Sequence, residues 1–251
     1  MTNAVLSFEF FPPNSKAGED KLMTVAQQLD NFKPDFYSVT FGAGGSAQHR
    51  TRDVVTELQG RVRADVAAHV SCVGMTEDKL VAMLSGYLKA NVRRLVVLRG
   101  DVSAEGLSFG EFRYASDLVS WIRSAFGDVF DISVACYPES NHAGDDFNHF
   151  IRKARLGANR AITQYFYNIE AYECFMERVR HAGCDIPIVP GIMPVHNLQS
   201  LRRFSQRCGA EVPRWMLKDL LAYSADPSAL QARGIELLTR LCDRLLNAGA
   251  P

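Results

Sequence analysis

The chain of 251 residues has no excess of charge, no long apolar run and no cysteine spacing of the kind that binds metal. Lys plus Arg and Asp plus Glu both total 28, so the formal net charge is zero, which argues against electrostatic binding to nucleic acid or to an acidic membrane surface. No apolar run approaches the roughly 18 residues that span a bilayer. The first predicted strand begins near residue 4, which leaves no room for a signal peptide. The sequence therefore predicts a cytoplasmic protein.

The six cysteines also argue against a disulfide framework. None forms a C-x-x-C pair, and several fall in apolar strand or helix positions, which predicts buried, reduced thiols. No metal site is expected. With 47% hydrophobic and 22% charged residues, the composition is typical of a globular domain with a large core. We expect one domain over residues 1–251.

What the chain does contain is a regular alternation of strand and helix patterns. Seven apolar runs read as parallel strands buried on both faces, at 4–11, 36–42, 65–73, 93–100, 130–137, 160–167 and 186–193. Helical spacing follows several of them, as in the face formed by Leu22, Val25, Ala26, Leu29 and Phe32. A similar pattern over 80–88 follows a candidate N-cap at Thr76.

The spacing of these strands favours a barrel. Polar residues follow six of the apolar runs at steps of 27 to 36 residues, the length of a βα unit. Such alternation predicts a parallel sheet, either open and doubly wound or closed, and its evenness favours an α/β fold of the (β/α)8 TIM-barrel type. An eighth strand is not evident after the seventh; helices are expected near 197–208 and 228–247. Either the chain continues past residue 251 or the barrel closes in another way, and we favour the first.

Glu9 is the most informative of the polar residues at strand ends. It lies among three phenylalanines and is followed by Pro12 and Pro13, which stop the strand. A carboxylate buried there would have a raised pKa and could serve as a general acid, whereas an edge strand would leave it in solvent. Because polar residues recur at the ends of the other strands, we favour the general acid.

Other candidates are weaker when each is taken alone. Arg99-Gly100-Asp101 closes the fourth strand and offers a close backbone approach, or a salt-bridged turn. His69 within a strand is more often a core residue than a catalyst. Arg152 and Lys153, which we place with Asp146 near the start of a helix, suit a pyrophosphate or a solvated face. Gln164 ends the sixth strand, and its amide suits the edge of a pterin or a nicotinamide.

Six segments together resemble the methylenetetrahydrofolate reductase family. They occur in the family's order over nearly the whole chain: Ser7–Pro13, Ser38–Ala43, Leu98–Asp101, Tyr114–Asp117, Gly157–Gln164 and Pro190–Pro194. The resemblance implies a flavin-binding barrel, an FAD-dependent oxidoreductase of one-carbon metabolism and methionine biosynthesis. Such an enzyme takes a hydride from NADH or NADPH and passes it to 5,10-methylenetetrahydrofolate by ping-pong kinetics. The resemblance to this family also implies a homo-oligomer.

The resemblance also implies roles for individual residues. Glu9 would protonate N10 of the folate, and Asp101 would stabilise cationic character near the flavin. Folate or nicotinamide contacts would come from Glu9, Thr40, Asp101, Gln164, Gln199 and Phe204. The implied FAD contacts are Thr40, Phe41, Ala43, His69, Arg99, Gly100, Asp101, Tyr114, Ala115, Tyr137, His142, Asp146, His149, Arg152 and Lys153.

Some positions depart from the family pattern. The loop after Tyr137 is shorter than expected, so that the usual loop histidine is His142 or has no equivalent, and His149 replaces an expected Asn. Ser200 replaces an expected Gln, for which Gln199 could substitute. Two other interpretations stay open. One is another flavin barrel, such as a proline dehydrogenase-like enzyme, and the other is a non-catalytic flavin- or folate-binding subunit of a larger complex.

Overall fold

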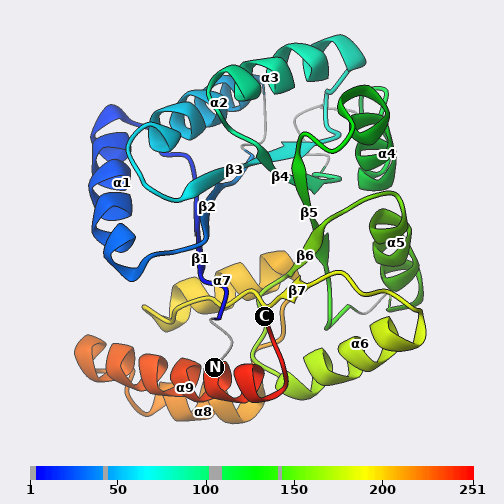
Figure 1. Ribbon diagram of the computed structural model, residues 1–251. Helices are drawn as coiled ribbons and strands as arrows, with labels where there is room; N and C mark the ends of the chain where they lie inside the picture. The colour runs from blue at the N-terminus through cyan, green and yellow to red at the C-terminus, as the bar shows by residue number, and fades with distance from the viewer. Residues whose placement is uncertain (1–3, 42–44, 102–108, 141–142) are drawn as a thin grey trace. The chain divides into compact units, whose positions relative to one another are not determined.

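The computed structural model describes residues 4–41, 45–101, 109–140 and 143–251, and within them parallel strands alternate with helices (Figure 1). The strands lie in chain order in one sheet: β1 Ser7–Phe10, β2 Phe36–Val39, β3 Asp65–Ser71, β4 Arg94–Leu98, β5 Asp131–Cys136, β6 Arg160–Thr163 and β7 Ile188–Val189. The helices are α1 Lys16–Leu29, α2 Gly45–Gln59, α3 Glu77–Lys89, α4 Ala115–Phe126, α5 Ala143–Arg155, α6 Ile169–His181, α7 Leu198–Cys208, α8 Arg214–Leu221 and α9 Pro227–Asn247, and η1 Asp30–Phe32 is a 3-10 turn.

This arrangement confirms the predicted fold class, an α/β fold of the TIM-barrel type. Each of the seven predicted strand ranges contains one observed strand. Within the described ranges no eighth strand follows β7, because residues 190–251 form α7, α8, α9 and their connections. The short helix α8 was not expected from the sequence; Pro213 stands at its N-cap, where a missing N–H costs nothing. No helix in the described part of the chain is long and apolar enough to cross a membrane.

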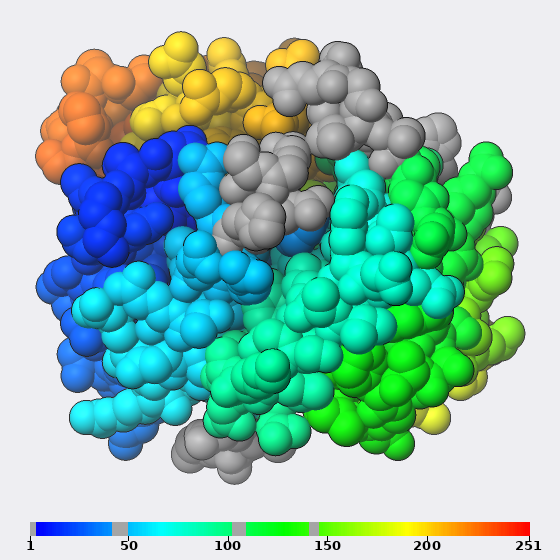
Figure 2. Space-filling model, turned by 90° about the horizontal axis from the view of Figure 1, so that it is seen from above, coloured from blue at the N-terminus to red at the C-terminus, as the bar shows by residue number. Residues whose placement is uncertain are grey.

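The chain divides into two compact units, which we describe separately. The first comprises residues 5–134 and 153–159 and contains β1 to β4 with α1 to α4. Strands β2 and β3 are buried along almost their whole length, as expected for strands covered on both faces. The helices α2 and α3 lie side by side over this part of the sheet (Figures 1 and 2).

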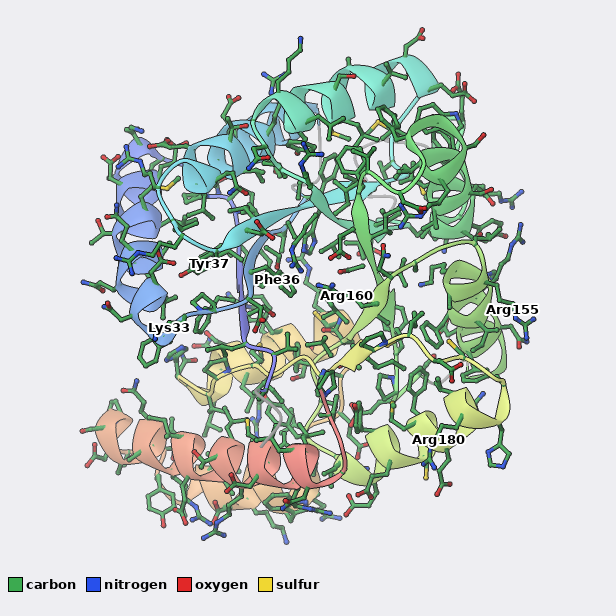
Figure 3. The ribbon with its side chains drawn as sticks, in the orientation of Figure 1. Lys33, Phe36, Tyr37, Arg155, Arg160 and Arg180 are labelled. Carbon is green, nitrogen blue, oxygen red and sulfur yellow. The ribbon has the colours of Figure 1, made fainter. Side chains whose placement is uncertain are left out.

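Local capping and hydrogen bonds explain where the helices of this unit begin and end. Thr76 accepts a hydrogen bond from the Lys79 N–H and begins α3, as predicted. The helix α1 ends at Leu29, so Phe32 was wrongly assigned to its buried face; the turn after α1 leaves that side chain 67% exposed. Tyr37 lies on the α1 side of β2 (Figure 3), and its hydroxyl is 2.9 Å from the Ala26 carbonyl.

Arg123 ties the last segment of this unit to α4. Its guanidinium donates hydrogen bonds to the carbonyls of Gly157, Gly127 and Phe130 at 2.8 to 3.0 Å and to the amide oxygen of Asn159 at 2.6 Å. The side chain is only 13% exposed. A buried cation with four acceptors is stabilising as long as all of them are engaged.

The other unit comprises residues 1–4, 135–152 and 160–251 and contains β6, β7 and α6 to α9. Its core is aromatic: Phe166 stacks on Tyr172 with ring centroids 5.5 Å apart, and Phe150 contacts Phe175 at the same distance. The Tyr172 hydroxyl donates a hydrogen bond to the Ile188 carbonyl at 3.2 Å, which links α6 to β7. Burial of these large side chains is the main favourable term for this unit.

The cysteines are free thiols. Cys72 and Cys136 are buried, as predicted, whereas Cys174 and Cys208 are exposed. Burial raises the pKa of the Cys72 thiol to about 12, so that it is protonated and unreactive near neutrality.

Candidate active site

Glu9 lies in β1 beside one residue from each of the next two strands. Its Oε2 accepts a hydrogen bond from the Ser38 hydroxyl at 3.5 Å and lies 3.3 Å from Nε2 of His69. Glu9 is paired with Ser38, and Ser38 is paired with Ala67, two residues before His69 on the same face of β3. The strand register therefore brings together three polar residues that are about 30 residues apart in the chain.

Glu9 and His69 differ in their access to solvent. The Glu9 side chain keeps 48% of its surface exposed, whereas the His69 side chain keeps 6%. Within the described residues, His69 Nε2 has no hydrogen-bond partner of good geometry, so that its 3.3 Å contact with Glu9 is an electrostatic approach without the alignment of a hydrogen bond. A buried, poorly paired nitrogen therefore faces a carboxylate that solvent can reach.

The pKa of Glu9 is lowered, and the predicted rise is wrong. Partial burial of the carboxylate acts to raise the pKa, and it is the largest single influence. The nearby His69, through its polar contact and its charge, and the Ser38 hydroxyl together outweigh that influence. The sequence shows the apolar neighbours of Glu9 along the chain, but the two polar neighbours come from other strands.

The segment after β4 requires glycine at position 100. Gly100 has φ of +76°, and a Cβ there would lie 2.9 Å from Val73 and 3.0 Å from Ser71. The guanidinium of Arg99 lies over the rings of Phe109, at 4.8 Å from the centroid, and Tyr114, at 5.9 Å. Asp101 follows with an exposed side chain. Gly100 therefore sets the course of the backbone between Arg99 and Asp101, and the two aromatic rings hold the guanidinium of Arg99 in place.

The other predicted flavin residues of this unit lie after β2 and at the start of α4. The Thr40 N–H donates to the Phe10 carbonyl at 2.9 Å, and Phe41 is half-buried. Ala43 lies outside the described residues, as does His142. Ala115 is the first residue of α4, whose first turn is closed by Asp117 accepting from the Tyr114 N–H at 3.0 Å. Both Tyr114 and Ala115 therefore stand where a helix presents its backbone N–H groups.

The two adjacent cations lie at the end of α5, not near its start as predicted. Lys153 is 8% exposed, whereas Arg152 is exposed. Consecutive helical residues point about 100° apart, which explains the difference between them. Asp146 is in the first part of the same helix and accepts a hydrogen bond from Ser140. His149 and Tyr137 are both exposed.

Gln164 follows β6 and has its amide orientation fixed by the backbone. Its Oε1 accepts a hydrogen bond from the Tyr165 N–H at 3.1 Å, and its own N–H donates to the Cys136 carbonyl at 2.9 Å. A backbone N–H can only donate, so the side-chain oxygen must be the atom that faces it. The amide NH2 group is then available to donate to a ligand.

The helix α7 carries Gln199 and Phe204, and Tyr165 anchors this helix to the end of β6. The Tyr165 hydroxyl donates to the buried Ser205 hydroxyl at 3.1 Å. On a helix, Gln199 is about 140° around from Phe204, whereas Ser200 is about 40° around. Ser200 rather than Gln199 therefore shares the face of Phe204, and Gln199 is exposed. Among the described residues no group of three or more His, Cys, Asp or Glu side chains could hold a metal ion.

Comparison with known proteins places the chain in a family. The family model described as methylenetetrahydrofolate reductase matches residues 1–251. The chain belongs to this family. It is 36% identical over 236 residues to the 5,10-methylenetetrahydrofolate reductase of Pectobacterium carotovorum, covering 92% of this chain and 78% of that protein. It is 38% identical over 215 residues to the Escherichia coli enzyme of the same name, covering 84% and 71%.

Two eukaryotic relatives extend the comparison. Methylenetetrahydrofolate reductase 1 of Schizosaccharomyces pombe is 34% identical over 251 residues, covering 97% of this chain but 42% of that protein. The rice protein named as a probable methylenetetrahydrofolate reductase (NADH) is 31% identical over 262 residues, covering 98% of this chain and 44% of its own length. Membership of the methylenetetrahydrofolate reductase family makes this chain an oxidoreductase.

Two polar residues of this family member escaped the sequence interpretation. Ser38 contacts Glu9, and Ser205 anchors α7. Ser38 could have been found from period-two alternation, since it stands two residues before Thr40, which follows β2, and so points to the same side of the extended chain. Ser205 carries no such signal, because a buried serine in a helix looks like any small core residue.

Proposed function

We propose that this chain reduces 5,10-methylenetetrahydrofolate to 5-methyltetrahydrofolate with bound FAD, and that NADH or NADPH is the hydride donor in a ping-pong cycle. The observation that carries the proposal is the carboxylate of Glu9, which is open to solvent and held by His69 and Ser38 in a member of this family. The rice relative's name supports NADH as one donor. The homo-oligomer expected from the sequence stays a prediction.

The residues present fit a flavin on two counts. Glycine at position 100 lets the backbone turn between Arg99 and Asp101, because a Cβ there would crowd Ser71 and Val73, and so it sets the positions of these two charged residues. Lys153 is a buried cation, of the kind that a phosphate oxygen can neutralise. We assign to FAD the contacts that the resemblance implies, with Arg99, Gly100 and Asp101 at the ring and Arg152 and Lys153 at the phosphates.

When bound, the flavin supplies two-electron hydride chemistry, and the chain supplies binding, orientation and protons. Arg99 is held over two aromatic rings, which fixes its guanidinium before a ligand arrives. The Asp101 carboxylate is exposed beside it and offers negative charge to a developing cation. Gln164 donates from its NH2 group to an acceptor on the folate or on the nicotinamide carboxamide. Phe204 offers a ring against which either substrate can stack.

Glu9 is assigned as the acid that protonates N10 of the folate. Protonation makes this nitrogen a leaving group, so the imidazolidine ring opens and leaves an iminium carbon to accept hydride. Because the pKa of Glu9 is lowered, the free chain holds this residue as a carboxylate near neutrality. The acid must therefore acquire its proton before or during the reaction with folate.

An anaerobic stopped-flow experiment tests the proposal. The yellow protein is mixed first with NADH or NADPH and then with methylenetetrahydrofolate, while the visible absorbance of oxidised flavin is followed. We expect bleaching by the nicotinamide and recovery of colour with the folate. A colourless protein that takes up no FAD, or colour that never returns with the folate, would contradict the proposed function.

A pair of matched variants identifies the acid. Glu9→Gln keeps the size of the side chain and removes its proton-donating ability, so we expect it to be bleached by the nicotinamide and to fail with the folate. General acid catalysis by one group contributes roughly 10²- to 10⁴-fold, which sets the expected loss. Glu173→Gln makes the same change on the exposed face of α6 and should behave as wild type. Normal folate turnover by Glu9→Gln would exclude Glu9 as the acid.

A further inference from the structure

The environment of Glu9 poses a problem for its proposed role. An acid must carry a proton at the moment of reaction, but Glu9 has surroundings that favour its ionised form. Ser38 donates its hydroxyl proton toward Oε2 and so stabilises the carboxylate. His69 approaches the same oxygen at 3.3 Å. The proton for the reaction must come from water or from a neighbouring group that can hold one.

His69 has the geometry of such a neighbour. It stands within β3, its side chain is 6% exposed, and its Nε2 has no well-aligned partner in the described part of the chain. A buried polar atom without a hydrogen bond costs free energy and is usually retained for a purpose. The 3.3 Å between Nε2 and Oε2 of Glu9 is already within hydrogen-bonding distance, so only the alignment of the imidazole separates this contact from an N–H···O bond.

The strand register keeps this contact in place. Glu9, Ser38 and Ala67 are consecutive partners across β1, β2 and β3, and His69 follows Ala67 by two residues. Because side chains alternate with a period of two, His69 points to the same face as Glu9. The neighbour of His69 on β4 is Val96, an apolar residue that is 3% exposed.

We propose that His69 is a positioning residue that stores the reaction's proton for Glu9, so that the acid is the Glu9–His69 pair. This inference rests on the proposed folate reduction. The pair holds one proton, which resides on Nε2 while the carboxylate is in contact with water. When folate covers Glu9 and excludes that water, an isolated carboxylate is disfavoured, and the proton moves from Nε2 to Oε2.

The transfer balances in atoms and in charge. The N–H bond of the imidazolium breaks as the O–H bond on Glu9 forms, and that O–H bond then breaks as N10 of the folate is protonated. The bond between N10 and the one-carbon unit breaks, and its electron pair stays on N10. The positive charge that leaves His69 ends on the iminium carbon, and Glu9 is again a carboxylate.

Few other groups act on the carboxylate. Among the described residues, the groups that shift its pKa are His69 from β3 and the Ser38 hydroxyl from β2. Strand β1 contributes no second charged residue. Replacing His69 should therefore change the titration of Glu9 directly, whereas a purely structural role for His69 would leave that titration unchanged.

The first test uses the chain without FAD and so does not depend on its activity. Glutamate is labelled with 13C at the side-chain carboxyl, and the Glu9 signal is assigned by its absence in Glu9→Gln. The pH is then titrated in wild type, His69→Gln and His69→Ala. We expect the Glu9 midpoint to lie lowest in wild type and to rise in both variants. The same midpoint in wild type and in two folded variants would overturn the proposal.

The second test measures the folate half-reaction per bound flavin as a function of pH. His69→Gln keeps an N–H that can hydrogen-bond to Glu9 but cannot store a proton, so we expect its rate to fall about tenfold per pH unit above the Glu9 midpoint, as expected for a lone carboxylic acid. Wild type should hold its rate to higher pH. Identical pH profiles for wild type and His69→Gln would refute the proton store. If His69→Gln does not fold, His69→Asn takes its place.

The two tests also separate this inference from the proposed function. Wild type that fails to reduce folate would contradict the function, while the carboxyl titration would still report on the Glu9–His69 pair. An altered Glu9 titration with an unaltered folate pH profile would limit His69 to an electrostatic role and overturn the proton store.

Discussion

Gly191 provides a quantitative test of how the residues after β7 hold the end of β6. A Cβ at this position would lie 2.5 Å from the Thr163 carbonyl oxygen and 3.1 Å from the Tyr165 nitrogen. The Gly191 N–H also donates to the Thr163 side-chain oxygen at 2.8 Å. The crowded atoms are backbone, so they cannot turn aside as a flexible side chain would. Gly191→Ala must move the segment that carries Gln164.

The size of the effect follows from this distance. Ordinary van der Waals contact needs about 3.5 Å, so the two segments must separate by about 1 Å. Overpacking of this kind typically costs 1–3 kcal/mol, and the rigidity of the backbone places Gly191→Ala at about 3 kcal/mol. With an m-value near 3 kcal/mol/M, the urea midpoint should fall by about 1 M. Because Gln164 moves with the strand end, KM for the folate should rise as well.

A control in the same chain should respond in the opposite direction. Gly86 lies inside α3, and a Cβ there would meet no atom within 4 Å. Gly86→Ala should therefore stabilise the chain by roughly 0.5–1 kcal/mol through better helix propensity. Urea unfolding followed by circular dichroism compares both variants with wild type. A Gly191→Ala protein as stable as wild type would refute the claim that β6 and the segment after β7 are in close, rigid contact.

Three further outcomes are expected. Arg123→Met leaves four acceptors without their charged donor and should lower the free energy of unfolding by about 3 kcal/mol in urea titration; a loss under 1 kcal/mol would contradict this. Tyr165→Phe removes one hydrogen bond to Ser205 and should lower the free energy of unfolding by about 1 kcal/mol in the same assay. It should also raise KM for the folate, and an unchanged KM would show that Tyr165 does not position α7. The pKa of Glu9 is lower in the folded chain, so the carboxylate of Glu9 contributes its full stabilisation above about pH 4.3 and loses it as the pH falls through the folded pKa. Between these two pH values Glu9→Gln should lose less free energy of unfolding than wild type. Equal losses in the two proteins would contradict the lowered pKa.

The strands could be predicted because their signal is local. Continuous apolar runs such as the one in β4 mark strands buried on both faces, and the steps between them match a βα unit. The helix α8 was missed because eight residues after a proline give too short a pattern to read. Phe32 was assigned to the wrong environment because the turn that ends α1 breaks the helical period there.

The site was predicted only in part. The sequence singled out Glu9, Gly100 and Gln164. These are a carboxylate among aromatic residues, a glycine after a strand and an amide at a strand end, and each is recognised from its residue type and its position relative to a predicted strand. It did not reveal that Gln164 has its oxygen committed to the Tyr165 N–H. That fact depends on a backbone conformation, which the order of residues does not specify.

By itself the sequence determined the fold class, the family and the list of polar residues at strand ends, since each of these follows from the residue types and their spacing along the chain. Only the tertiary structure decided the ionisation of Glu9. The expected rise in its pKa follows from the apolar neighbours in the segment, whereas the lowering follows from His69 and Ser38. Those neighbours are about 30 and 60 residues away, and strand register alone brings them within 3.5 Å.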